Sequence, residues 1–313
     1  MQLRFRRALV PISALALALP LAACGDGGGT ASDAAGDTVD VLASFYPLQY
    51  LTQRVGGDAV TVSSLTPAGA EPHDLELSPA QVASVGRADL VVYLSGFQPA
   101  VDTAVTEAAP TAIDVAGAAR LRDAAHEEEH DHEGEEEGHD HGTLDPHFWL
   151  DPIRMADAAD AVAAQLSEVD PDGAADFEAN AATLRTELEG LDGSYRTGLA
   201  QCETTTIVVA HEAYGYLATA YGLEQEGISG IDPDAEPSPA RLREIEQVVR
   251  DTGVNIIFTE SLIDPRVAEV LAGDLGITTG VLDPLENQAD PEADYLDVME
   301  SNLASLRDAL TCA

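Results

Sequence analysis

The stretch TVDVLASFYPLQYLTQRVGGDAVTVSSL, Thr38–Leu65, indicates the fold class of this chain of 313 residues. Its first part, TVDVLASF, has the β-branched and apolar residues of a strand, and AVTVSSL at its end is a second such run. Between them, YPLQYLTQRVGG has the composition of a helix that two glycines close. A strand, a helix and a strand in this order predict two parallel strands with a crossover helix.

The same alternation recurs before and after a long helical region. Strands at DLVVYLS and TAIDV complete a first set, and TTIVVA, EQEGIS, NIIFTE and TTGVL form a second, with helical segments between them. From Pro152 to Ala200 the composition is almost entirely helical. We therefore predict an α/β fold with two lobes, each a small parallel sheet flanked by helices, joined by one long helix. The expected boundaries are 38–168 for the N-terminal lobe, 171–200 for the linking helix and 201–313 for the C-terminal lobe.

The charge of the chain limits its ligands. Hydrophobic residues make up 45% of the sequence, as in a globular protein, yet the formal net charge is −41, and all 15 basic residues are arginine. So large a negative charge repels phosphate backbones, which argues against nucleic-acid binding. It raises the local concentration of cations, and this favours a cationic ligand.

Residues 1–23 have the features of a signal peptide. Arginines precede an apolar stretch that two prolines interrupt, and the stretch is shorter than the roughly 20 apolar residues of a spanning helix. It ends in LAAC, Leu21–Cys24, which resembles the lipobox of bacterial lipoproteins, where the cysteine is lipidated and becomes the first mature residue. The alternative is an ordinary signal peptide cut before an unrelated cysteine. The glycine-rich residues 24–37 predict a flexible tether behind a lipidated Cys24.

The other two cysteines, Cys202 and Cys312, are candidates for a disulfide. An exported protein meets an oxidising environment, and an even pair of cysteines there favours a bond between them. Two buried free thiols are the alternative.

A tract rich in histidine, Ala125–Gly142, contains five of the eight histidines and a formal match to the metalloprotease motif H-E-x-x-H at His126–His130. That motif needs a helix with an apolar side. Here nine acidic residues and two glycines lie between His126 and His141, so we predict a solvated loop and not a protease site. Imidazoles on such a loop still bind metal weakly. The residues expected to do so are His126, His130, His132, His139 and His141.

The three remaining histidines are candidates for a tight metal site. His211 directly follows strand TTIVVA, and His73 lies in the loop after strand AVTVSSL. Asp283 directly follows strand TTGVL, and ligands of parallel sheets collect at such carboxyl ends of strands. His147 lies between two Asp-Pro turns, just past the histidine-rich loop. Three imidazoles and one carboxylate, two from each lobe, make a tetrahedral set suited to zinc.

Four segments that carry these residues resemble the metal-binding motifs of a known family. EPHDLELSP, DPHFWLDP, AHEAYGYLA and VLDPL are similar to those of the zinc and manganese substrate-binding proteins of bacterial ABC transporters. The resemblance implies two α/β lobes, a rigid linking helix and a metal buried between the lobes. It implies that the ligands are His73, His147, His211 and Asp283, and an acidic histidine-rich loop is typical of zinc-specific members.

Two neighbouring carboxylates are further candidates. Glu71 precedes His73 by two residues and, by the same resemblance, is an alternative to Asp283 as the fourth ligand. Glu260 ends strand NIIFTE and either orients a ligating imidazole or is an ordinary surface carboxylate.

The function that the resemblance implies is the extracytoplasmic, lipid-anchored zinc-binding component of an ABC importer. We expect a monomer that carries Zn²⁺ as transported ligand to a permease and its ATPase and is not an enzyme. A histidine at position 211 favours zinc over manganese, because manganese prefers oxygen donors. The alternatives are a manganese-binding homologue, a zinc buffer or adhesin, and a zinc hydrolase, which would need an open coordination position.

Overall fold

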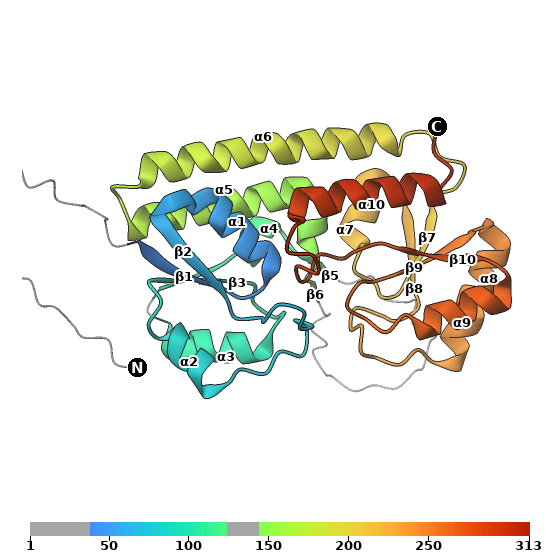
Figure 1. The fold of residues 1–313 in the computed structure, drawn as a ribbon, viewed down its shortest axis with the longest axis horizontal. Helices are drawn as coiled ribbons and strands as arrows, with labels where there is room; N and C mark the ends of the chain where they lie inside the picture. Colours follow the sequence, from blue (N-terminus) through green and yellow to red (C-terminus); the bar gives the residue numbers. More distant parts are fainter. Residues whose placement is uncertain (1–37, 110, 124–143) are drawn as a thin grey trace, which may run out of the picture. The chain divides into compact units, whose positions relative to one another are not determined.

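The fold is seen in a computed structural model that describes residues 38–109, 111–123 and 144–313 (Figure 1). The predicted signal peptide, Cys24, the tether and the five histidines of the acidic tract lie outside the described residues. Within the described ranges, no helix has the length and apolar character needed to cross a membrane.

The N-terminal lobe is built on a parallel four-stranded sheet in the order β2-β1-β3-β4. Helices between the strands cover this sheet. At the start of helix α2 (Pro79–Val85), the Ser78 hydroxyl accepts the backbone N–H of Gln81, and the Gln81 side chain accepts the backbone N–H of Ser78. The strands are β1 (Val39–Ala43), β2 (Val60–Ser64), β3 (Leu90–Tyr93) and β4 (Ala112–Asp114). The helices are α1 (Tyr46–Gly56), the short η1 (Gly57–Ala59), α2 (Pro79–Val85), α3 (Pro99–Ala108) and α4 (Ala116–Ala119).

The C-terminal lobe repeats this plan with a parallel sheet in the order β10-β9-β7-β8. Three of its helices end in a left-handed glycine, the residue that reverses the chain at the least steric cost. The strands are β7 (Thr206–Val209), β8 (Glu224–Gly227), β9 (Ile256–Thr259) and β10 (Thr278–Val281). The helices are α7 (Gly215–Tyr221), α8 (Pro239–Thr252), α9 (Arg266–Leu275) and α10 (Tyr295–Ala309). The predicted α/β class with two lobes is therefore confirmed.

Two long helices, α5 (Pro152–Val169) and α6 (Ala174–Gly198), follow the N-terminal lobe in the sequence and precede the C-terminal one. They pack against each other. The first half of α6 contacts the N-terminal lobe, where Asn180 donates to the carbonyl of Val55 at 2.9 Å. Its last turns contact the C-terminal lobe, where the Tyr195 hydroxyl donates to the carbonyl of Met299 at 2.7 Å. One helix thus braces both lobes along its length (Figure 1).

A disulfide between Cys202 and Cys312 joins the end of the chain to the start of the C-terminal lobe. Backbone bonds run beside it, from Glu203 N–H to the carbonyl of Leu310 and from Ala313 N–H to that of Gln201. The alternative of two free thiols does not hold. The bond spans 110 residues, and closing a loop of this length stabilises the fold by roughly 3–5 kcal/mol in the chain-entropy model.

A small antiparallel pair that the sequence did not predict encloses the histidine-rich tract. Strands β5 (Arg122–Asp123) and β6 (Leu144–Asp145) pair so that Asp123 faces Leu144. The described residues that flank the tract, Asp123 and Leu144, therefore lie side by side, close in the sequence to the turn that carries His147.

Candidate metal site

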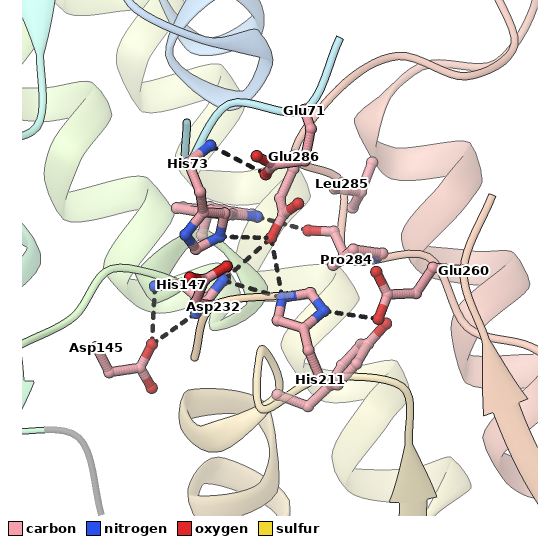
Figure 2. A network of polar contacts seen from close by, with 12 residues as sticks. Glu71, His73, Asp145, His147, His211, Asp232, Glu260, Pro284, Leu285 and Glu286 are labelled. Atoms are coloured by element: carbon pink, nitrogen blue, oxygen red, sulfur yellow. Dashed lines mark hydrogen bonds and ion pairs between the residues drawn. The ribbon is translucent and has the colours of Figure 1, made fainter. Parts of the chain in front are cut away.

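Four side chains from both lobes meet at one point: His73, His147, His211 and Glu286 (Figure 2). One potential ligand atom from each lies within 4.8 Å of those of the others. His147, His211 and Glu286 are buried, and the His73 side chain is 11% exposed. Among the described residues, this is the group of histidine and acidic side chains with the geometry to hold a metal ion.

The fold brings the four side chains together from the carboxyl ends of strands. His73 lies in the loop between β2 and α2, and His147 comes just after β6, before the short helix η2 (Phe148–Leu150). His211 follows β7, and Glu286 lies in the segment after β10. The edges of two parallel sheets therefore face each other across the site, as binding sites of open α/β sheets do.

The carboxylate of Glu286 occupies the centre of the cluster. Its Oε1 atom lies 3.2 Å from Nε2 of His73, 3.1 Å from Nε2 of His147 and 3.1 Å from Nε2 of His211. All three imidazoles thus direct the same nitrogen to one point.

The two buried histidines are each held by a carboxylate on the opposite ring nitrogen. Asp145 Oδ1 lies 2.8 Å from Nδ1 of His147 and also accepts that residue's backbone N–H at 3.0 Å. Glu260 Oε1 lies 2.6 Å from Nδ1 of His211. A carboxylate there fixes the ring and leaves Nε2 for the metal, which is the common arrangement around protein-bound zinc. Glu260 is buried beside His211, which supports the orienting role over that of a surface carboxylate.

These contacts shift the acid–base behaviour of the site. Burial lowers the pKa of His211, but hydrogen bonds to Glu260 and Glu286 outweigh it and raise the pKa to about 10. The pKa of His147 also rises, because Asp145 and Glu286 outweigh the effect of burial. For Glu286, burial acts upward, yet the three histidines hold its pKa well below the usual value. The raised pKa values of the two histidines and the lowered pKa of Glu286 favour ion pairs within the buried site.

The structure brings Glu286, and not the predicted Asp283, together with the three histidines. One Asp283 oxygen accepts the hydroxyl of Ser261 at 2.8 Å, and the other accepts the backbone N–H of Leu285 at 2.8 Å. Leu285 has a left-handed backbone, with φ of 59°, which a leucine adopts only when its surroundings hold it. Asp283 thus holds a turn that directs Glu286, three residues later, into the site.

Glu71, the other candidate for the fourth ligand, lies close by but is engaged with its own loop (Figure 2). Its oxygens accept the backbone N–H of His73 at 2.9 Å and that of Asp74 at 3.2 Å. It also lines a cavity of about 300 Å³ that reaches His211 and Glu260 from the C-terminal lobe. In this geometry Glu71 shapes the loop that presents His73, and Glu286 is the carboxylate that lies close to all three histidines.

Sequence reasoning missed Glu286, although it stands in the segment VLDPLENQ that directed attention to Asp283. Both acids lie beyond the carboxyl end of β10, so position relative to the strand cannot distinguish them. Three imidazoles and one carboxylate remain the donor set, and this set suits four-coordinate zinc.

Comparisons with known proteins agree with this chemistry. Residues 41–309 match the model of a protein family described as zinc-uptake complex component A, periplasmic. The high-affinity zinc uptake system protein ZnuA of Bacillus subtilis is 34% identical over 301 residues, covering 93% of this chain and 94% of that protein.

Two streptococcal proteins are also similar. The zinc-binding lipoprotein AdcA of Streptococcus pneumoniae is 36% identical over 277 residues, which are 86% of this chain but 55% of that protein, so this chain spans about half of its length. The solved structure of the laminin-binding protein Lmb of Streptococcus agalactiae superposes with a TM-score of 0.78 at 30% identity, covering 87% of this chain and 99% of that one. Lmb is described as a bifunctional protein with adhesin and metal-transporting activity.

Proposed function

Because this chain belongs to the zinc-uptake complex component A family, we propose that it captures zinc outside the cytoplasm and delivers it to a membrane importer. His73, His147, His211 and Glu286 are the proposed ligands of the transported ion. The partners are the permease of an ABC transporter and its ATPase, and the protein performs no chemical step on its cargo.

The observation that carries this proposal is the convergence of three Nε2 atoms on one oxygen of Glu286. Four protein donors complete the tetrahedral coordination that zinc prefers in closed sites. A zinc hydrolase keeps one position open for water, and four converging donors argue against that alternative.

The choice of zinc over manganese rests on the three imidazoles. Manganese favours oxygen donors and higher coordination numbers, whereas zinc accepts imidazole-rich sites of four ligands. Asp145 and Glu260 support this choice, because each increases the basicity of the imidazole that it contacts.

The anchoring of the protein is a further part of the proposal. LAAC at Leu21–Cys24 supports lipidation of Cys24, and the similar AdcA is named a lipoprotein. A Cys24→Ala variant expressed in a bacterium should leave the membrane fraction for the medium or periplasm. Full retention in the membrane fraction would contradict the anchor without affecting the metal site.

Metal titration of the mature protein tests the central proposal. Protein purified without added metal should bind one zinc ion tightly, and manganese should fail to displace it at comparable concentration. His211→Ala should lose most of the tight binding, because it removes a ligand without a substitute. Several weak ions and no tight one would instead support a zinc buffer, and turnover of a test ester would support a hydrolase.

Adhesion is a second candidate, favoured by the similarity to Lmb. Binding of the purified protein to immobilised laminin tests it independently of zinc titration. Tight zinc binding without laminin binding would leave transport as the sole function supported.

A further inference from the structure

His73 differs from the other two histidines of the site in how it is held. His147 and His211 are fully buried, and each has a carboxylate on its Nδ1 atom. His73 is the most exposed of the three, and among the described residues no carboxylate contacts its Nδ1. Its imidazole packs edge-on against Phe97 and is otherwise positioned by the loop that carries it, residues 66–77.

Within the N-terminal lobe, Gln98 holds this loop. The buried Gln98 amide donates to the hydroxyl of Thr66 at 3.0 Å and to the carbonyl of Pro72 at 3.1 Å. Glu71 then closes the turn around His73 by accepting two backbone N–H groups. These contacts connect the loop to the lobe to which it belongs.

From the C-terminal lobe, Asn287 reaches the same loop. Its Nδ2 atom donates to the carbonyl of Pro67 at 2.9 Å and to that of Ala70 at 2.6 Å. Asn287 is 6% exposed and directly follows Glu286, the carboxylate at the centre of the site. One side chain therefore satisfies two backbone acceptors on the other lobe while its neighbour contacts all three histidines.

We propose that Asn287 is a latch between the lobes, a positioning residue that keeps the His73 loop against Glu286 and so sets how long zinc stays bound. The inference rests on the proposed zinc-binding function. Glu286 and Asn287 are adjacent in the chain. When their backbone moves away from the His73 loop, the carboxylate leaves the site and both hydrogen bonds from the Asn287 amide to the loop break. Release of the ion and opening of the loop then become one event.

The test compares Asn287→Ala with Gln288→Ala. Gln288 is the next residue and also donates from its amide, at 2.9 Å to the carbonyl of Ala293, but that bond stays within the C-terminal lobe. Zinc dissociation is followed by rapid mixing of the zinc-loaded protein with excess chelator. We expect Asn287→Ala to release zinc about tenfold faster, as the loss of two neutral hydrogen bonds implies, and Gln288→Ala to match the unmodified protein.

Two further readouts separate a latch from a general loss of structure. The rate of zinc association should change little, because Asn287 contacts only backbone carbonyls of the loop and is not a proposed ligand of the ion. Amide hydrogen exchange in the zinc-loaded protein should speed up within residues 66–77 in Asn287→Ala and remain unchanged elsewhere. Unchanged zinc dissociation, or faster exchange throughout the protein, would overturn the proposal. Failure of the unmodified protein and of Gln288→Ala to bind zinc would instead reject the proposed function.

Discussion

His211 lies between two carboxylates, with Nδ1 2.6 Å from Oε1 of Glu260 and Nε2 3.1 Å from Oε1 of Glu286. The first carboxylate contacts the ring on its far side and has no direct path to an ion at Nε2. Its influence on zinc must therefore pass through the imidazole, by fixing its orientation and raising its basicity.

Replacement of Glu260 should weaken zinc binding without abolishing it. In Glu260→Gln the side chain keeps its size but loses the charge that supports His211, and we expect affinity to fall about 10- to 100-fold. Competition with a chelator of known affinity measures the change. Glu300→Gln is the matched control, since Glu300 is exposed on the same lobe and its loss changes the net charge equally. Equal affinity in the two variants would remove the role assigned to Glu260.

The two acids beyond β10 should respond differently to loss of charge. Glu286→Gln should lose tight zinc binding, because it removes the one anionic ligand proposed for the ion. Asp283→Asn keeps the acceptor for the N–H of Leu285 and should retain affinity within about tenfold, the lower end of the range for residues that only support a ligand. Zinc titration of both variants decides the matter. A larger loss in Asp283→Asn than in Glu286→Gln would restore Asp283 as the ligand.

Zinc binding should release protons over a wide pH range. In the metal-free site Glu260 and Glu286 raise the pKa of His211 to about 10, and that of His147 is raised as well. A ring must lose its proton to bind zinc, so at pH 7 zinc binding should release the proton of His211 together with any proton held by His147.

The direction in which zinc affinity changes with pH follows from the same pKa shifts. The protonated rings stabilise the metal-free fold fully below their unfolded pKa of about 6.5, and that contribution disappears as pH rises towards the folded value. Zinc affinity should therefore continue to rise between pH 7 and 9. Calorimetry in buffers of different ionisation enthalpy counts the protons, and an affinity that is constant above pH 7 would contradict the prediction.

The histidine-rich tract can be removed without disturbing the strands that enclose it. Deleting Ala125–Gly142 leaves Ala124 and Thr143 between Asp123 and Leu144, which already pair, and two residues suffice for a hairpin turn. Replacing these two residues by Asn-Gly suits such a turn. We expect calorimetry to show loss of the weak binding events and retention of one tight site. Loss of the tight event would show that the tract supplies a primary ligand.

The strand and helix pattern predicted the architecture because each element carries its own signal. Val39–Ala43 and Thr206–Val209 are short apolar runs between turn residues, and Ser78 and Ser238 cap the helices that follow them. The two-residue strands β5 and β6 were missed, since two residues are too few to show a period.

The candidate site was predictable to the extent that it depends on residue type. Histidines are rare outside the acidic tract, so His73, His147 and His211 stood out, and their positions near strand ends supported the choice. Glu286 did not stand out, because the direction of its side chain depends on the left-handed backbone of Leu285. A leucine in the sequence does not indicate this conformation. The contact between Asn287 and the loop 66–77 depends on how two lobes meet and has no local signal.

The carboxylates around the histidines also make the site an exchanger of protons for metal. The raised pKa values of His147 and His211 favour protonated rings beside the carboxylates of Asp145, Glu260 and Glu286. An ion that binds there displaces protons, so the net charge of the site rises by less than the ion's own two units. An importer that receives zinc from this chain, as proposed, then has a smaller charge difference to recognise. The position of the loop that carries His73 is a second feature that it can recognise.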